Sequence, residues 1–253
     1  MKAYKGIQLG EVKFGNDNRR YTADIENNLI YASLKGIKYI NDEVKEYLWF
    51  LSQEYKFNNY IELYDYLKFK LNKRHIETLI KINYFKDFGT QLKLINWALY
   101  SNEVFDKKQY RIAQLSSSPN MLAFVNQFSN RQTEKTIYVD EDGAKQLREK
   151  LFEIMPNQEF SIIEKVKHEV ELAGEVLTPL PEGVTVGQVG AISYKKPVFL
   201  FKSWKNSKEV WINLDSKKDM PKRDNIVLLY NLELRRGKYN KDDVFAQIEV
   251  IKE

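Results

Sequence analysis

The stretch "PVFLFKSWKNSKEVWINL" (residues 197–214) contains two apolar segments that flank a polar turn. Segments of this length, rich in β-branched and aromatic residues, predict two β-strands joined by a short connection. In the first strand Phe199 and Phe201 share one face, while Leu200 and Lys202 lie on the other, because side chains alternate along a strand. One of these two faces must be buried in a core.

The same period of two recurs from Val184 to the end of the chain. The candidate strands are "VTVGQVGAISY", "PVFLFKSW", "KEVWINL", "NIVLLYNLEL" and "VFAQIEVI". Short strands with little helix between them predict a small five-stranded Greek-key barrel, most simply an OB-fold, with an SH3-like barrel as the alternative. We expect Tyr194 and Trp204 to be exposed at strand ends and Trp211 to lie in the core.

Helical patterns dominate from about residue 41 to residue 101, after a lead-in of short strands and turns, and further helices are expected after residue 135. Good capping residues mark the expected helix starts, which are Asn41, Asn58 or Asn59, Asn72, Thr90, and Asp140 or Asp142. Residues 102–135 are polar and irregular apart from a short helix in "NMLAFVNQF", and "KTIYV" is typical of a strand. A further helix is expected in "NQEFSIIEKVKHEVEL", before the proline-rich "LTPLPEG" (177–183).

The composition limits the class of protein. The chain has 253 residues, a formal charge of +5 and no cysteine. A disulfide framework is therefore excluded, and the composition suits a reducing cytoplasm. The N-terminal "MKAYKGIQLGEVKFG" lacks the apolar segment of a signal peptide, and no apolar run is long enough for a membrane span. A mildly basic balance fits a polyanionic partner.

No catalytic constellation is recognisable. The two histidines, His75 and His168, are far apart in sequence, and isolated surface histidines are favoured over a metal site. The acidic "VDEDG" (139–143) resembles a magnesium ligand set, but its position before a helix favours a capping role. We therefore expect no metal, no cofactor and no autonomous catalysis.

The segment "YASLKGIKYINDEVKEYLWFL" has a tight turn before a capped helix, the layout of a helix-hairpin-helix. In such a motif, backbone N–H groups of the hairpin and of the helix start hold a DNA phosphate. The hairpin usually has glycine, a hydrophobic residue and glycine, whereas this chain has Tyr39, Ile40 and Asn41, and tyrosine tolerates a left-handed backbone poorly. The candidate phosphate contacts are Lys35, Lys38, Asn41, Lys45, Asn72, Lys73 and Arg74.

The order of motifs from residue 16 to 95 resembles the bacterial replicative DNA polymerase III alpha subunit, of the C-family. The resemblance rests on "LKGIKYIND", on "NKR" (72–74), on "ETLIK" (77–81) and on "YFKDFG" (84–89). The family has a small residue and glycine where this chain has Asn83 and Tyr84. Residues 160–182 resemble, more loosely, the segment that leads to the family's OB domain.

The resemblance implies a C-terminal polymerase region without the catalytic palm. The family's PHP domain, catalytic aspartates and nucleotide-binding glycine-serine signature have no counterpart in the sequence. The start at Met1 fits a separate gene product, as in a split polymerase of a phage or mobile element, or a cloned fragment. The implied partners are duplex and single-stranded DNA and a separately encoded catalytic part. A replisome docking or inhibitory protein that does not bind DNA is the alternative.

The domains expected on these grounds are residues 1–101, a strand-turn lead-in with the helix-hairpin-helix module; 102–176, an α/β connecting region; and 184–253, the barrel. The fold class is thus α+β.

The barrel carries a strong basic bias, with thirteen Lys or Arg against five Asp or Glu between Lys195 and Lys241. Single-strand binders combine such charge with aromatic platforms on which bases stack. The candidate contacts are Tyr194, Lys195, Lys196, Trp204, Lys205, Arg235, Arg236, Lys238 and Tyr239. "QLKLI" (91–95) resembles a sliding-clamp peptide, although a place inside a core helix is favoured.

Overall fold

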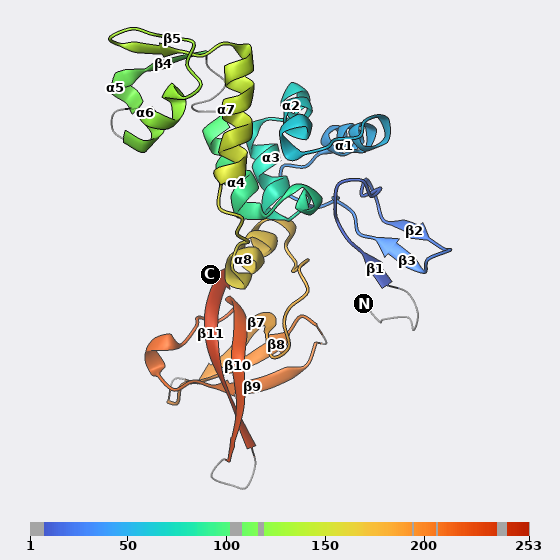
Figure 1. Ribbon diagram of the computed structural model, residues 1–253. Coiled ribbons are helices and arrows are strands. Elements are labelled where there is room, and N and C mark those ends of the chain that lie inside the picture. The colour runs from blue at the N-terminus through green and yellow to red at the C-terminus, as the bar shows by residue number, and fades with distance from the viewer. Residues whose placement is uncertain are drawn as a thin grey trace. The chain divides into compact units, whose positions relative to one another are not determined.

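The computed structural model describes residues 8–101, 108–115, 119–193, 195–205, 207–236 and 242–252 (Figure 1). The chain forms two compact units, residues 1–159 and 160–253, which we call unit 1 and unit 2. Unit 1 is mostly helical and unit 2 holds a closed five-stranded barrel. The α+β class expected from the sequence is confirmed.

Unit 1 begins with a small sheet. Its strands β1 (Gln8–Gly10), β2 (Thr22–Asp24) and β3 (Leu29–Tyr31) lie in the order β1-β3-β2, with β1 parallel and β2 antiparallel to β3. Four helices and one 3-10 turn follow. They are α1 (Asp42–Glu54), α2 (Tyr60–Lys70), α3 (Lys73–Lys81), η1 (Lys86–Phe88) and α4 (Gln91–Tyr100).

The predicted caps start these helices. The side chains of Asn41, Asn59 and Asn72 each accept a hydrogen bond from a backbone N–H in the first turn of α1, α2 and α3. This bond satisfies one of the N–H groups that a helix start leaves without a partner. Thr90 precedes α4 without capping it, because its hydroxyl donates instead to Asn157 Oδ1 at 3.2 Å.

The C-terminus of α3 is closed by a turn with a left-handed residue. The N–H of Tyr84 donates to Leu79 O and that of Asn83 to Ile80 O, both at 2.9 Å. This is the Schellman pattern, in which the residue after the cap takes a positive φ. Asn83 occupies that position with φ of 62°. The turn brings Tyr84 and Phe85 into the core, where both are buried.

The core of unit 1 is aromatic. Tyr60, Tyr64, Phe85 and Trp97 are fully buried. Trp97 meets Tyr64 edge to face at 5.1 Å between ring centroids, and its indole N–H donates to the backbone O of Arg148 at 3.1 Å. The Arg148 guanidinium in turn forms a two-pronged ion pair with Asp65. These contacts attach the later helix α7 (Glu141–Ile154) to α2 and α4.

The remainder of unit 1 is a small α/β substructure. Its elements are β4 (Gln109–Arg111), α5 (Ile112–Leu115), α6 (Pro119–Asn126), β5 (Arg131–Gln132), β6 (Thr136–Tyr138) and α7 (Glu141–Ile154). The strands form an antiparallel sheet in the order β4-β6-β5. The expected strand, short helix and Asp140 cap are confirmed. Asp140 accepts from the N–H of Gly143 at 2.8 Å, which supports the capping interpretation of the acidic stretch.

In its described residues, unit 2 contains a helix, five strands and one 3-10 turn. They are α8 (Ile162–Ala173), β7 (Thr185–Ser193), β8 (Val198–Ser203), β9 (Glu209–Asn213), η3 (Lys217–Asp219), β10 (Ile226–Arg236) and β11 (Asp242–Lys252). The strands close in the order β7-β8-β9-β11-β10, and β10 pairs back with β7. All pairs are antiparallel except β9 with β11. This parallel pair distinguishes the OB-like barrel from an up-and-down barrel.

The structure shows which face of the strand at residues 198–203 is buried in the barrel core. Phe199 and Phe201 face inward and are buried with Val189, Ile212 and Val227. Leu200 and Lys202 therefore lie on the outer face.

Helix α8 covers part of the outer barrel surface. Val166 and Val170 of α8 pack on Val186 of β7 and Leu228 of β10. The connection from α8 to β7 is held by buried Glu169, whose carboxylate accepts the N–H of Leu177 at 2.8 Å and that of Thr178 at 2.9 Å. The hydroxyl of Thr178 donates to the same carboxylate. One acid thus fixes the proline-rich segment against the helix.

We predict that Glu169→Gln destabilises unit 2 by about 1.5–3 kcal/mol, because an amide replaces a charged acceptor opposite several donors. The urea unfolding midpoint and amide exchange at Leu177 and Thr178 measure the effect. Glu171→Gln, an exposed change on the same helix, serves as the control and is expected to stay within about 0.5 kcal/mol of the parent. Equal midpoints for the two variants would refute this role.

Asn83 supplies a second prediction. Asn83→Gly is expected to be neutral or stabilising by up to about 1 kcal/mol, because glycine adopts positive φ without steric cost and the unpaired buried Asn83 Oδ1 disappears. Asn83→Val is expected to lose about 2 kcal/mol, since a β-branched residue is strained there. Urea unfolding of the two variants gives the comparison, and valine matching glycine would contradict the assigned turn.

Candidate nucleic-acid interface

The turn before α1 presents the first group of predicted contacts. It follows β3 and carries two positive φ values, 94° at Gly36 and 67° at Tyr39. Lys35, Lys38 and Tyr39 are exposed, whereas the neighbouring isoleucines are buried. The tyrosine therefore adopts the left-handed backbone that the hairpin demands, at a steric cost that glycine would avoid.

The start of α1 itself is poorly suited to an anion. Asn41 Oδ1 already accepts the N–H of Val44 at 2.9 Å, and Asp42 and Glu43 fill the first turn. The Lys45 side chain is only 7% exposed, and its ammonium lies 2.5 Å from Asp42. The charge that Lys45 could offer a phosphate is thus neutralised within the helix.

The start of α3 differs in its electrostatics. Its first turn holds Lys73 and Arg74 and no acid, so side-chain charge adds to the positive end of the helix. Asn72 caps this turn by accepting the N–H of His75 at 3.0 Å. Partial burial lowers the pKa of His75 below its usual value, which favours the neutral imidazole near pH 7. Lys73 and Arg74 therefore supply the charge here.

Arg74 also connects the predicted contacts in the turn before α1 with those at the start of α3. Its guanidinium lies 4.5 Å from the centroid of the Tyr39 ring, a cation–π contact. The exposed lysines at 35 and 38 and the first turn of α3 thereby belong to one basic surface of unit 1. The sequence placed these residues in separate motifs, and only the fold brings them together.

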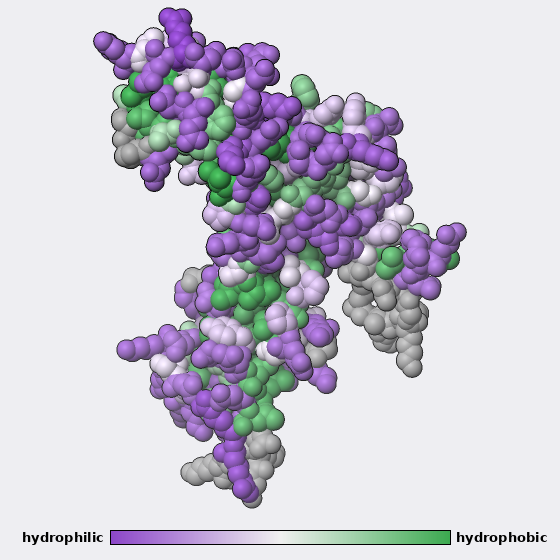
Figure 2. Space-filling model, viewed as in Figure 1, coloured by the Kyte–Doolittle hydropathy of each residue, from purple (hydrophilic) through white to green (hydrophobic). Residues whose placement is uncertain are grey.

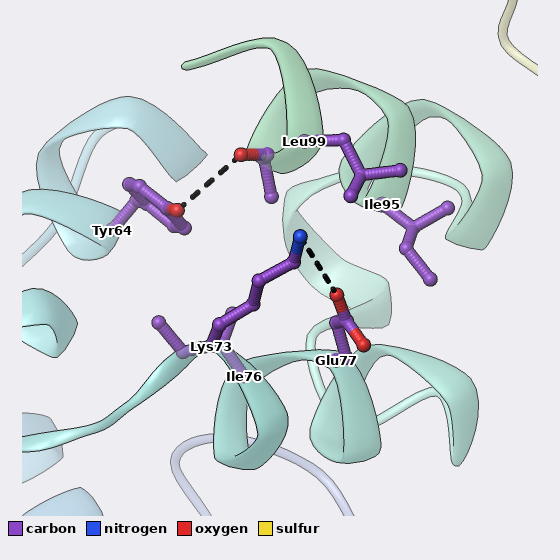
Figure 3. A pocket seen from close by; sticks show the side chains of 7 residues that line it. Tyr64, Lys73, Ile76, Glu77, Ile95 and Leu99 are labelled. Carbon is purple, nitrogen blue, oxygen red and sulfur yellow. Dashed lines mark hydrogen bonds and ion pairs between the residues drawn. The ribbon is translucent and has the colours of Figure 1, made fainter. Parts of the chain in front are cut away.

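Figure 3 shows that the Lys73 side chain forms an ion pair with Glu77 of the same helix. Its ammonium lies 3.9 Å from Glu77 Oε1, beside a cavity lined by residues of α2, α3 and α4. Across this cavity the Tyr64 hydroxyl donates to Ala98 O at 3.5 Å. The cavity measures about 10 Å³ and holds no more than a single water. It is therefore a packing defect.

The stretch 91–95 is the first turn of α4. Gln91 is buried, and its amide donates to Lys81 O at 2.8 Å and to Ile80 O at 3.3 Å. A clamp peptide must present its glutamine to a partner, so the core-helix interpretation is confirmed here.

The barrel provides the more open surface. Helix α8 covers Val186 of β7 and Leu228 of β10, whereas no residue of β8 or β9 belongs to this contact, so β8 and β9 form the outer face that is free of the helix. Cross-strand register on this face places Leu200 opposite Trp211 and Lys202 opposite Glu209. Trp211 is 50% exposed beside Leu200, an arrangement that offers an aromatic platform.

The prediction that Trp211 lies in the core is therefore wrong. Ile212 and Leu214 occupy the inward positions of this region, and strand alternation turns Trp211 outward. The signal was present in the sequence as the spacing between Ile212 and Leu214. Lys202, next to this platform in register, was likewise missed as a contact.

The remaining barrel candidates lie at strand ends. Lys195 and Lys196 form the β7–β8 turn, and Trp204 and Lys205 follow β8, with Trp204 38% exposed as expected. Tyr194, Lys238 and Tyr239 fall outside the described residues.

Arg235 and Arg236 end β10. Arg235 bonds to Asp215 Oδ1 at 2.6 Å and to Glu233 at 3.0 Å, and its guanidinium lies 4.2 Å from the Phe245 ring centroid. The pKa of Asp215 is lowered by this hydrogen bond. Arg235 is thus neutralised by two acids, so it is a weaker candidate than the lysines of the β7–β8 turn.

Within the described ranges, no three His, Asp or Glu side chains lie close enough together to hold a metal ion. None of the described helices combines the length and apolar character needed to cross a membrane. No protein-family model matches the chain, and no curated protein is detectably similar to it in sequence. The functional argument therefore rests on the residues themselves.

We predict that Trp211→Ala costs less than about 1 kcal/mol of stability, because the ring packs on the outside of the barrel. Phe199→Ala, in the interior of the neighbouring strand, is expected to cost about 3–5 kcal/mol. Denaturant unfolding of the two variants provides the test. A loss at Trp211 as large as that at Phe199 would place the indole in the core after all.

Proposed function

We propose that this chain is a non-catalytic DNA-binding portion or subunit of a C-family replicative DNA polymerase. Its barrel binds single-stranded template, and the basic surface of unit 1 contacts duplex. The observation that carries the proposal is the outer barrel face, where Trp211 stands exposed opposite Leu200, with Lys202 next along the same face of β8.

The chemistry of this face suits a single strand. Bases that have left a duplex expose flat apolar surfaces, and an indole offers a stacking partner for any base. Lysines nearby neutralise backbone phosphates and release counterions, which gives affinity without sequence specificity. OB-like barrels use their second and third strands for such contacts, and these correspond to β8 and β9.

Unit 1 supports the duplex part of the proposal. Lys35, Lys38 and Arg74 are exposed and joined through Tyr39 into one basic surface. Phosphate contacts of this kind position a protein on DNA without reading its sequence. The first turn of α3, which holds two cations and no acid, is the best-suited helix start of the four at residues 42–100.

The polymerase assignment rests on the resemblance of residues 16–95. Asn83, where the family carries a small residue, has a φ of 62° and closes the turn after α3. Tyr84, where the family carries a glycine, is buried in the core of unit 1.

A docking function without DNA binding is favoured by a different observation. A chain of ring contacts crosses α1 and α2, and we call it the aromatic cluster. Its members are Tyr47, Phe50, Tyr55, Phe57, Tyr66 and Phe69. Phe69 is 83% exposed. Exposed aromatic residues are enriched at protein interfaces. Proteins that the chain retains from host lysate after nuclease treatment, together with absent DNA binding, would support this alternative.

The proposal is tested by fluorescence anisotropy with a labelled primed template over a salt series. We expect tight binding at low salt and a logarithmic salt slope of about −4 to −5, as for roughly six phosphate contacts. Trp211→Ala should weaken binding about tenfold or more while leaving the slope unchanged, because stacking is lost but no charge is removed. Arg74→Gln should reduce the slope by about one.

Leu234→Ala is the control for Trp211→Ala, because it truncates an exposed apolar side chain on β10, outside the β8–β9 face. It should leave affinity unchanged. An absence of binding by the parent chain at low salt would refute the proposed function. A flat salt response would remove its electrostatic basis.

A further inference from the structure

A pocket of about 380 Å³ lies at the end of the barrel where β7 turns into β8 and where the segment between β9 and β10 crosses. It is lined by Ile192, Ser193, Lys196, Lys217, Met220, Pro221, Lys222 and Arg223. Its volume is within the range of small-molecule sites. In Figure 2 hydrophilic residues gather on this side of the barrel, over the segment between β9 and β10.

The charge of the pocket is one-sided. Four of the lining residues are cationic, and none of the described lining residues is acidic. Of the acids in the crossing segment, Asp215 is paired with Arg235, while Asp219 and Asp224 do not line the pocket. A concave surface of one sign concentrates the potential and attracts a ligand of opposite charge.

The floor of the pocket is apolar. Ile192 and Met220 are partly buried and pack on the core cluster of the barrel, and Pro221 is buried beside them. Cations around an apolar floor suit a ligand that combines phosphate with a flat, weakly polar ring. A nucleotide has both parts, whereas inorganic phosphate would leave the floor unused.

The walls are held in place by hydrogen bonds. Asn225, which is buried, accepts the N–H of Lys222 on its side-chain oxygen at 2.8 Å. The backbone of this turn is tied to β7, since the N–H of Asp224 donates to Val189 O and the N–H of Val189 to Asn225 O, both at 2.9 Å. A wall fixed in this way needs little ordering when a ligand binds.

We propose that this pocket binds a nucleotide, with the base on Ile192, Met220 and Pro221 and the phosphate among Lys196, Lys217, Lys222 and Arg223. The nucleotide comes either from a free mononucleotide or from a residue of a single strand. The inference rests on the proposed function only if the nucleotide is a residue of a single strand, and not if it is a free mononucleotide. It adds a binding site distinct from the Trp211 platform, and none of its residues except Lys196 was singled out in the sequence.

Methyl-labelled methionine NMR gives a direct reading, because the chain has four methionines and Met220 lines the pocket. Met220→Leu assigns the signal. We expect thymidylate, or an oligothymidylate of about 12 nucleotides, to shift the Met220 methyl signal selectively. Thymidine and inorganic phosphate should each shift it less at equal concentration, since each lacks one half of the recognised chemistry.

Arg223→Gln should weaken the ligand about tenfold, as expected for the loss of a charge-assisted contact. Lys218→Gln is the matched control. Lys218 lies in η3 next to the lining residue Lys217 but does not itself line the pocket, so the variant removes the same charge outside the proposed site. It should bind within about twofold of the parent. Arg223→Lys, which keeps the charge, should retain most of the affinity and guards against misfolding of the glutamine variant.

The outcomes separate the two proposals. Binding of oligothymidylate without any movement of Met220 would overturn the pocket and leave the proposed function standing. A Met220 shift by thymidylate in a chain that does not bind DNA would support the pocket and refute the proposed function. Equal shifts with inorganic phosphate, or equal weakening by Lys218→Gln and Arg223→Gln, would also overturn the pocket.

Discussion

The pairing of Phe199 with Ile212 across β8 and β9 is the constraint on which the barrel surface depends. Both side chains face the core, where Phe199 is fully buried and Ile212 nearly so, and burial of such apolar side chains is the main favourable contribution to folding. Strand alternation then turns Lys202 and Trp211 outward together. A register slip of one residue would expose both apolar side chains, so the buried pair fixes the exposed platform.

Helix α8 completes this division of the surface. By covering Val186 of β7 and Leu228 of β10 it removes one outer face from solvent and leaves the outer face of β8 and β9 open. Glu169 then fixes the connection to β7. The extent of the proposed binding face thus depends both on which strands α8 covers and on which side chains the other strands expose. In unit 1 the asparagine caps accept hydrogen bonds from N–H groups in the first turns of α1, α2 and α3. The positive charge available to an anion at these helix starts therefore comes from flanking lysines and arginines.

Much of the fold was readable from local patterns. The caps at Asn41, Asn59 and Asn72 and the five barrel strands follow from short-range rules that act within a few residues. Of the small sheet β4-β6-β5 only β6 was foreseen, because β4 and β5 are very short, carry little apolar periodicity and are stabilised by pairing with β6. Trp211 was misjudged because size and hydrophobicity were weighed above its position in the alternation.

The sequence by itself determined the fold class, the helix starts and the basic character of the barrel. These properties depend on local propensity and composition, which act before distant segments meet. Only the tertiary structure decided that Arg74 lies on Tyr39, that Lys45 is buried against Asp42, and that cations from two separate loops line one pocket. Contacts of this kind join residues far apart in the chain, or depend on which face a neighbour covers.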